Sequence, residues 1–140
     1  NSRNTIPGEV FFAVDLRNPD DDKLTAMAET LRADAARLCA ELGLNLQLEE
    51  IWYSPPIAFD PDCVEAVRSG AAIGGFASMD IVSGAGHDAC YISRVAPTGM
   101  IFVPCADGIS HNEAESATPE DLAAGCNVLL HAMLERAIVE

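Results

Sequence analysis

The sequence GISHNEAE occupies residues 108–115, between the apolar run MIFVP at residues 100–104 and a helix start at Thr118. Four consecutive apolar residues, three of them with high strand propensity, predict a short buried strand at 100–104. A loop that leaves such a strand can carry polar side chains into a cleft while the strand keeps the loop in place. Within this loop, His111 is the residue that we expect to bind a metal ion.

Length, composition and charge limit the class of protein. The chain has 140 residues, of which 49% are hydrophobic, so it can form one domain with a core and is not disordered. A net charge of −14 disfavours nucleic-acid binding, which relies on Lys and Arg side chains that neutralise phosphates. No apolar stretch approaches the roughly 20 residues that a membrane span requires, and the first residues do not resemble a signal peptide. We therefore expect neither nucleic acid nor a membrane as a partner.

Five cysteines are present, an odd number, and no C-x-x-C motif occurs. Cys39, Cys90 and Cys126 lie among apolar residues in segments that we expect to be helical. Buried free thiols in a reducing compartment explain this pattern better than a disulfide framework does. We therefore expect a cytoplasmic protein.

The first part of the chain predicts a β-α-β unit. Residues 9–17 alternate apolar and polar side chains, as do residues 44–52, and both segments are expected to be half-buried strands. Between them, residues 23–42 carry apolar side chains at helical spacing and end at Gly43. Such a unit is too small to close a core alone, so we expect it to pair with further strands from this chain or another.

The sequence SPP at residues 54–56 predicts a hinge, because two consecutive prolines prevent a helix and stiffen the chain. After it, the sequence DPD at 60–62 begins a helix that ends at Gly74 and Gly75. A final helix is expected from Thr118, with Pro119 in its first position.

A glycine-rich turn, SGAGHDA, occupies residues 83–89 and precedes a further expected helix. Glycines before a helix can leave free N–H groups that suit an anion, but a plain helix start explains the pattern better. The spacing lacks the third glycine of a dinucleotide fingerprint.

The turn and the loop at 108–115 together supply imidazole and carboxylate groups for a metal site or for acid–base chemistry. A hydrogen-bonded structural histidine is the competing interpretation at each position. The candidates are His87, Asp88, His111, Asn112, Glu113 and Glu115.

Three stretches carry a resemblance to a known family. They are SGAGHDA at 83–89, MIFVP followed by DGISHN and Glu115 at 100–115, and NTIPGEV with DLR at 4–17. In this order they resemble the motifs of the N-carbamoyl-L-amino-acid hydrolase, β-ureidopropionase and allantoate amidohydrolase family. That family is a branch of the dinuclear-metal aminoacylase-type peptidases, and the resemblance covers nearly the whole chain.

The resemblance implies an α/β fold in two parts. Residues 1–53 match the second half of a lid, or dimerisation, domain, and residues 54–56 form the hinge. Residues 57–140 match the C-terminal portion of the catalytic domain. Family members are longer, and their upstream catalytic segment has no counterpart here. We therefore expect this chain to be inactive alone and the complete enzyme to be a homodimer joined through its lids.

The resemblance also implies a metal centre. The family holds two divalent metal ions, for which zinc, manganese, cobalt and nickel are all candidates. His111 matches the C-terminal metal ligand, and Glu115 is placed in support of it. The remaining ligands match no residue of this chain.

The substrate implied by the resemblance is a small ureido acid. Asn4 and Arg17 match lid residues that bind the substrate, and an Arg fork suits its carboxylate. Gly86 matches a backbone contact to substrate, and His87 is expected to be catalytic in the same motif. The expected reaction is hydrolysis of the carbamoyl C–N bond. A non-catalytic dimerisation fragment and an N-acyl or peptide hydrolase of the same fold are the alternatives.

Overall fold

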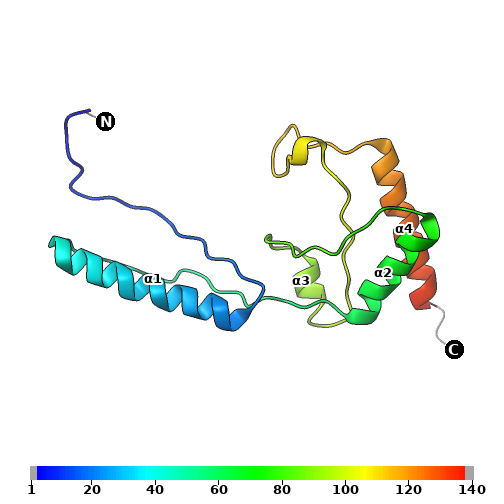
Figure 1. Cartoon of the computed structure of the whole chain (residues 1–140), viewed down its shortest axis with the longest axis horizontal. Coiled ribbons are helices and arrows are strands. Elements are labelled where there is room, and N and C mark those ends of the chain that lie inside the picture. Colours follow the sequence, from blue (N-terminus) through cyan, green and yellow to red (C-terminus); the bar gives the residue numbers. More distant parts are fainter. Residues whose placement is uncertain (1–2, 138–140) are drawn as a thin grey trace. The chain divides into compact units, whose positions relative to one another are not determined.

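The computed structural model describes residues 3–137, and the chain divides into two compact units, Asn1–Pro56 and Ile57–Glu140. The lid and catalytic roles implied for the two parts stay predictions. The described residues form these helical elements (Figure 1): α1 (Asp21–Leu42), α2 (Pro61–Gly74), α3 (Ala89–Ile92), the 3-10 helix η1 (Ala106–Gly108) and α4 (Pro119–Ala137). None of them is both long and apolar enough to cross a membrane.

Helix α1 confirms the prediction from spacing and capping. Asp20 is its N-cap, and the Asp20 carboxylate accepts a hydrogen bond from the Lys23 backbone N–H at 3.2 Å. Gly43 ends the helix with a φ of 69°, a left-handed conformation that glycine adopts without steric cost. No residue of α1 is buried, so its apolar stripe lacks a complete partner.

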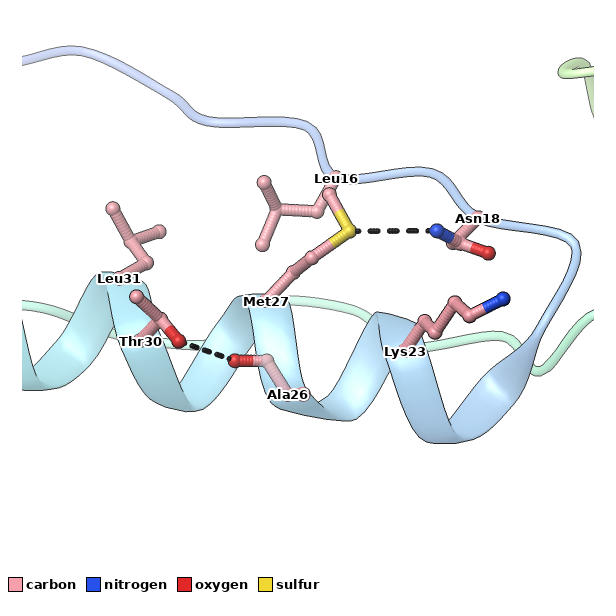
Figure 2. A pocket seen from close by; sticks show the side chains of 7 residues that line it. All are labelled: Leu16, Asn18, Lys23, Ala26, Met27, Thr30 and Leu31. Carbon is pink, nitrogen blue, oxygen red and sulfur yellow. Dashed lines mark hydrogen bonds between the residues drawn. The ribbon is translucent and has the colours of Figure 1, made fainter.

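Extended segments flank α1 within the first unit. The segment before the helix contributes Leu16 and Asn18 to an open groove that also contains Met27 of α1 (Figure 2). In that groove, the Asn18 amide donates a hydrogen bond to the Met27 sulfur at 3.7 Å. The segment after the helix is held by the Tyr53 hydroxyl, which donates to Asp21, and by the ion pair of Glu50 with Arg32.

The predicted strands at 9–17, 44–52 and 100–104 do not form within residues 3–137. The α/β class is therefore not confirmed by the described part of the chain, which is helical with extended connections. The physical reason is that alternation specifies a side-chain face, whereas a strand also requires a neighbouring strand for its backbone hydrogen bonds. Phe12, which the alternation predicted to lie on a half-buried strand, is 74% exposed.

The second unit contains a packed helix pair, α2 with α4. Small residues allow the two helices to approach closely, and a Cβ added to Gly70 would lie 2.9 Å from the Val128 carbonyl oxygen. The buried side chains are therefore small. They are Ala66 and Ala71 of α2 and Val128 and Ala132 of α4.

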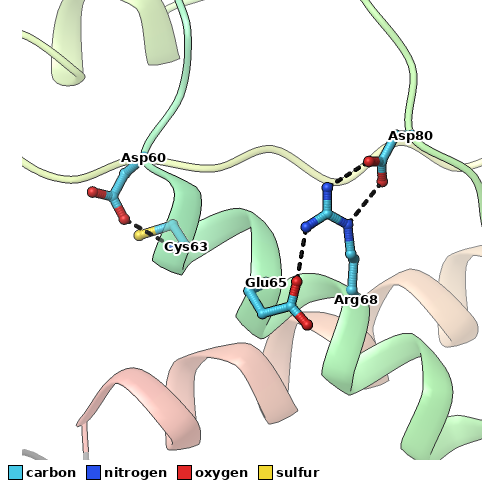
Figure 3. Close-up of polar contacts among 5 residues, drawn as sticks. All are labelled: Asp60, Cys63, Glu65, Arg68 and Asp80. Carbon is cyan, nitrogen blue, oxygen red and sulfur yellow. Dashed lines mark hydrogen bonds and ion pairs between the residues drawn. The ribbon is translucent and has the colours of Figure 1, made fainter.

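Both helices of this pair begin as their sequences predict. The Asp60 carboxylate accepts a hydrogen bond from the Cys63 backbone N–H at 2.9 Å, and this bond lowers the pKa of Asp60 (Figure 3). The pKa of the Cys63 thiol is raised, first by burial and then by Asp60. At the start of α4, the Thr118 hydroxyl accepts a hydrogen bond from the Asp121 backbone N–H at 3.1 Å.

A chain segment beyond α2 is attached to that helix by an arginine. Arg68 donates to both carboxylate oxygens of Asp80, at 3.2 and 2.5 Å, and to Glu65 at 2.8 Å (Figure 3). The Arg68 hydrogen bonds lower the pKa of Asp80. Asp80 lies shortly before the glycine turn, so this contact anchors one end of a segment that carries candidate site residues.

Candidate metal and substrate site

The loop that carries His111 is closed at its base. The Ala106 backbone N–H donates a hydrogen bond to the Ser116 carbonyl oxygen at 2.8 Å. Between these residues the chain forms η1, in which Asp107 and Gly108 have φ values of 54° and 68°. The closed base gives the loop a defined path between residues 100–104 and α4.

His111 lies in this loop with its side chain exposed and its backbone in the left-handed region, at a φ of 56°. That conformation costs an L-residue about 1–2 kcal/mol, so neighbouring interactions must stabilise it. The His111 backbone N–H donates to the Glu115 carboxylate at 2.9 Å. Two further hydrogen bonds shape the turn: the Ala114 N–H donates to the Asn112 side chain, and the Glu115 N–H donates to the Asn112 carbonyl.

Glu115 contacts the main chain of His111, and no hydrogen bond joins its carboxylate to the imidazole in the described structure. Its second oxygen lies 3.9 Å from the sulfur of Cys105, which is within the reach of a weak S–H donor. Glu115 therefore supports the predicted metal ligand through the backbone.

The glycine turn brings His87 to a serine that the sequence interpretation did not select. Ser83 Oγ and His87 Nε2 are 2.7 Å apart, and Ser83 Oγ also accepts the Ala85 N–H at 3.2 Å. The His87 ring meets the Phe102 ring edge-on, with centroids 5.5 Å apart. This contact places the motif at 83–89 beside the apolar run at 100–104.

The glycine turn leads into helix α3, which is too short to provide the helix dipole that would attract an anion. Helix α3 has four residues, and Asp88 makes no capping hydrogen bond with its side chain. Gly86 does not adopt a positive φ, and a Cβ added there would meet no atom within 4 Å. Neither the backbone conformation nor the packing in the described structure requires a glycine at position 86.

Arg17 is bound by Asp15, another residue that the sequence interpretation did not select. Its Nε lies 3.1 and 3.2 Å from the two Asp15 carboxylate oxygens, and its Nη2 lies 2.5 Å from one of them. These hydrogen bonds lower the pKa of Asp15 and raise the pKa of Arg17. The residues are two apart in an extended segment and so share a face, a spacing that the sequence already contained. Asn4 is exposed in a turn of the same unit.

The described residues contain no group of three or more His, Cys, Asp or Glu side chains able to hold a metal ion. Within residues 3–137, no hydrogen bond or ring contact joins His87 to His111. His111 is thus a single exposed imidazole that suits the role of one ligand among several. The side chains of residues 3–137 therefore do not form a complete metal centre by themselves.

Comparison with known proteins shows the family. Residues 6–135 match the model of Peptidase family M20/M25/M40. An N-carbamoyl-L-amino-acid amidohydrolase from Rhizobium meliloti is 50% identical over 100% of this chain and 34% of its own length. An allantoate amidohydrolase from Bacillus subtilis is 33% identical over 92% of this chain and 31% of its own length. The chain belongs to Peptidase family M20/M25/M40.

A solved structure has the same fold over most of the chain. It is an amidase of the hydantoinase/carbamoylase family from Burkholderia multivorans, with 60% sequence identity and a TM-score of 0.84. The match covers 87% of this chain and 30% of the solved one. The chain spans about a third of the length of the curated relatives it matches. The resemblance seen in the motifs is confirmed.

Proposed function

We propose that this chain is part of a metal-dependent amidohydrolase that cleaves the carbamoyl C–N bond of N-carbamoyl amino acids or related ureido acids. The observation that carries the proposal is 50% identity, over the whole chain, to a protein named N-carbamoyl-L-amino-acid amidohydrolase. In the complete enzyme, residues 1–53 form the second half of the lid and residues 57–140 form part of the catalytic domain. The extended segments then become strands of an α/β fold by pairing with other parts of the enzyme.

His111 is the metal ligand that this chain contributes. An exposed imidazole suits zinc, manganese, cobalt or nickel. Two bound metal ions would polarise the ureido carbonyl and activate the attacking water. The other ligands come from the upstream catalytic segment of the complete enzyme.

Arg17 binds the carboxylate of the ureido acid, and Asn4 binds its polar groups. The Arg17 fork already binds a carboxylate bidentately, that of Asp15, so its geometry suits a second one. Substrate and Asp15 therefore share the same guanidinium. Closure of the lid brings both residues onto the substrate and excludes bulk water.

His87 is the catalytic imidazole of the glycine turn. Ser83 holds its Nε2, and Nδ1 makes no hydrogen bond within the described residues. The second nitrogen can therefore donate a proton to the substrate or accept one from it. Gly86 allows the substrate to approach the backbone, because no side chain occupies the open space at that position.

A substrate panel tests the reaction class. The complete enzyme, loaded in turn with each candidate metal, is offered N-carbamoyl amino acids, allantoate, N-acetyl amino acids and dipeptides. We expect ammonia release from the ureido substrates and much slower cleavage of the others. Faster cleavage of N-acetyl amino acids or dipeptides would replace this proposal with an N-acyl or peptide hydrolase.

The role of Arg17 has its own prediction. Arg17→Ala removes the carboxylate fork, so we expect KM for the ureido acid to rise by roughly two orders of magnitude, as for the loss of a charged hydrogen-bonding partner. Metal content should stay unchanged, because the guanidinium binds no metal. Equal losses of metal and substrate binding would contradict the assignment. Lys23→Ala, which removes another exposed cation of the same unit, is the matched control.

The exposed apolar surface of the first unit favours a second function, homodimerisation. Phe11 and Phe12 are 94% and 74% exposed, and the segment that carries them pairs with no other strand within residues 3–137. We propose that a second copy of the lid covers this surface. Sedimentation of the metal-free protein measures its self-association, and a monomer at all concentrations would contradict this proposal.

The five free cysteines fit a cytoplasmic location, which we propose for the enzyme.

A further inference from the structure

We propose that Glu115 is a positioning residue that aims His111 by binding its backbone amide. This inference rests on the proposed role of His111 as a metal ligand. It concerns the way in which the chain presents that imidazole. Glu115 does not have to touch the ring, the metal or the substrate to do so.

The geometry of the turn supports the inference. His111 has a left-handed backbone with a φ of 56°, a conformation that an L-residue keeps only when neighbouring contacts stabilise it. The Glu115 carboxylate lies 2.9 Å from the His111 nitrogen, and a charged acceptor makes this a strong hydrogen bond. The Glu115 N–H in turn donates to the Asn112 carbonyl at 3.0 Å. Glu115 thus closes the turn twice, with its carboxylate on the His111 amide and with its backbone N–H on the Asn112 carbonyl.

The carboxylate itself is held from a second side. One oxygen binds the His111 amide, and the other lies 3.9 Å from the sulfur of Cys105. Cys105 immediately precedes Ala106, whose N–H closes the base of the loop on Ser116. The contact with Cys105 therefore fixes the Glu115 carboxylate relative to the closed base of the loop. The hydrogen bond from the His111 amide in turn fixes the His111 backbone relative to Glu115.

A neighbouring residue provides a matched control. Glu113 lies in the same loop, two residues from both His111 and Glu115, and carries the same charge. It makes no hydrogen bond or ion pair within the described part of the chain. A general effect of loop charge would therefore appear equally at Glu113, whereas a positioning effect would appear only at Glu115.

The experiment compares Glu115→Ala, Glu115→Gln, Glu113→Ala and His111→Ala in the complete enzyme. Metal affinity is measured by competition with a chelator, and the visible spectrum of bound cobalt reports the ligand geometry. Amide exchange of His111 in the metal-free protein is followed with histidine-selective isotope labelling. Circular dichroism checks that each variant is folded.

We expect Glu115→Ala to lower metal affinity by roughly 10- to 100-fold, to change the cobalt spectrum and to speed the exchange of the His111 amide. Glu115→Gln keeps an acceptor oxygen and should restore most of the affinity. Glu113→Ala should match the parent protein. Unchanged affinity and amide exchange in Glu115→Ala, while His111→Ala loses the metal, would overturn the inference and leave the proposed function standing. Full metal affinity in His111→Ala would instead overturn the proposed function.

Discussion

The two units of the chain use the same local signals and reach different degrees of burial. In the first, α1 is capped at both ends by Asp20 and Gly43, yet none of its residues is buried. In the second, α2 is capped by Asp60 and Gly75, packs against α4 and has three buried residues. Capping and periodicity specify a helix locally, whereas burial requires a partner surface. The second unit contains such a partner, and the first presents apolar faces for one.

The largest effect is expected where the backbones of α2 and α4 approach each other closely in the second unit. Gly70→Ala would place a methyl group 2.9 Å from the Val128 carbonyl and 3.1 Å from the Cβ of His131, so α2 and α4 must move apart. We expect the free energy of unfolding to fall by about 1–3 kcal/mol, measured by urea denaturation. Gly8→Ala in the first unit meets no atom within 4 Å and is the matched control. An equal loss of unfolding free energy in Gly70→Ala and Gly8→Ala would contradict the claim that the second unit is more closely packed than the first.

A smaller effect is expected on the open face of the first unit. Phe12 is 74% exposed in this 140-residue chain, so Phe12→Ser should leave the helical content of the chain by itself nearly unchanged. It should weaken self-association, because it removes apolar area from the surface that we assign to a second copy. Sedimentation velocity over a concentration series measures the association constant. A large loss of helical content with unchanged association would show that Phe12 is part of a core.

The smallest effect is expected at Asp60, where two variants distinguish the contribution of its negative charge to stability from that of its capping hydrogen bond. The folded pKa of Asp60 lies below its ordinary value of 3.8, because the Cys63 backbone N–H binds the ionised carboxylate. The stabilisation is therefore present above that ordinary value and is lost as pH falls through the folded pKa. Asp60→Asn keeps a capping acceptor but should abolish this part of the acid dependence, whereas Asp60→Ala should also lower Tm at neutral pH. Thermal melts at neutral and strongly acidic pH distinguish the two variants. Identical acid dependence in the parent and Asp60→Asn would contradict the assignment.

The sequence predicted the helices because their signals are local. Asp20 and Asp60 cap the backbone three residues ahead, and Gly43 and Gly75 provide left-handed ends, so each signal and its effect lie within one turn. The strands could not be confirmed in the same way. The alternation at residues 9–17 states which side chains share a face, but the backbone partner lies at no fixed distance in the sequence.

The candidate site was predictable to a similar extent. The motif around His111 predicts a metal ligand, and that role stays a prediction. No spacing rule stated that Glu115 would bind the backbone of His111 rather than its ring. The Ser83–His87 pair depends likewise on the path of a glycine turn. Residue types are visible in the sequence, whereas hydrogen-bond directions follow from loop conformation.

Metal content of the His111→Ala variant tests the central claim most directly. The complete enzyme and the variant are loaded with zinc or manganese, freed of unbound ions and analysed by elemental mass spectrometry. If His111 is the ligand contributed by this chain, the variant should lose metal occupancy while circular dichroism shows a folded protein. Full occupancy in the folded variant would contradict the account and remove His111 from the metal centre.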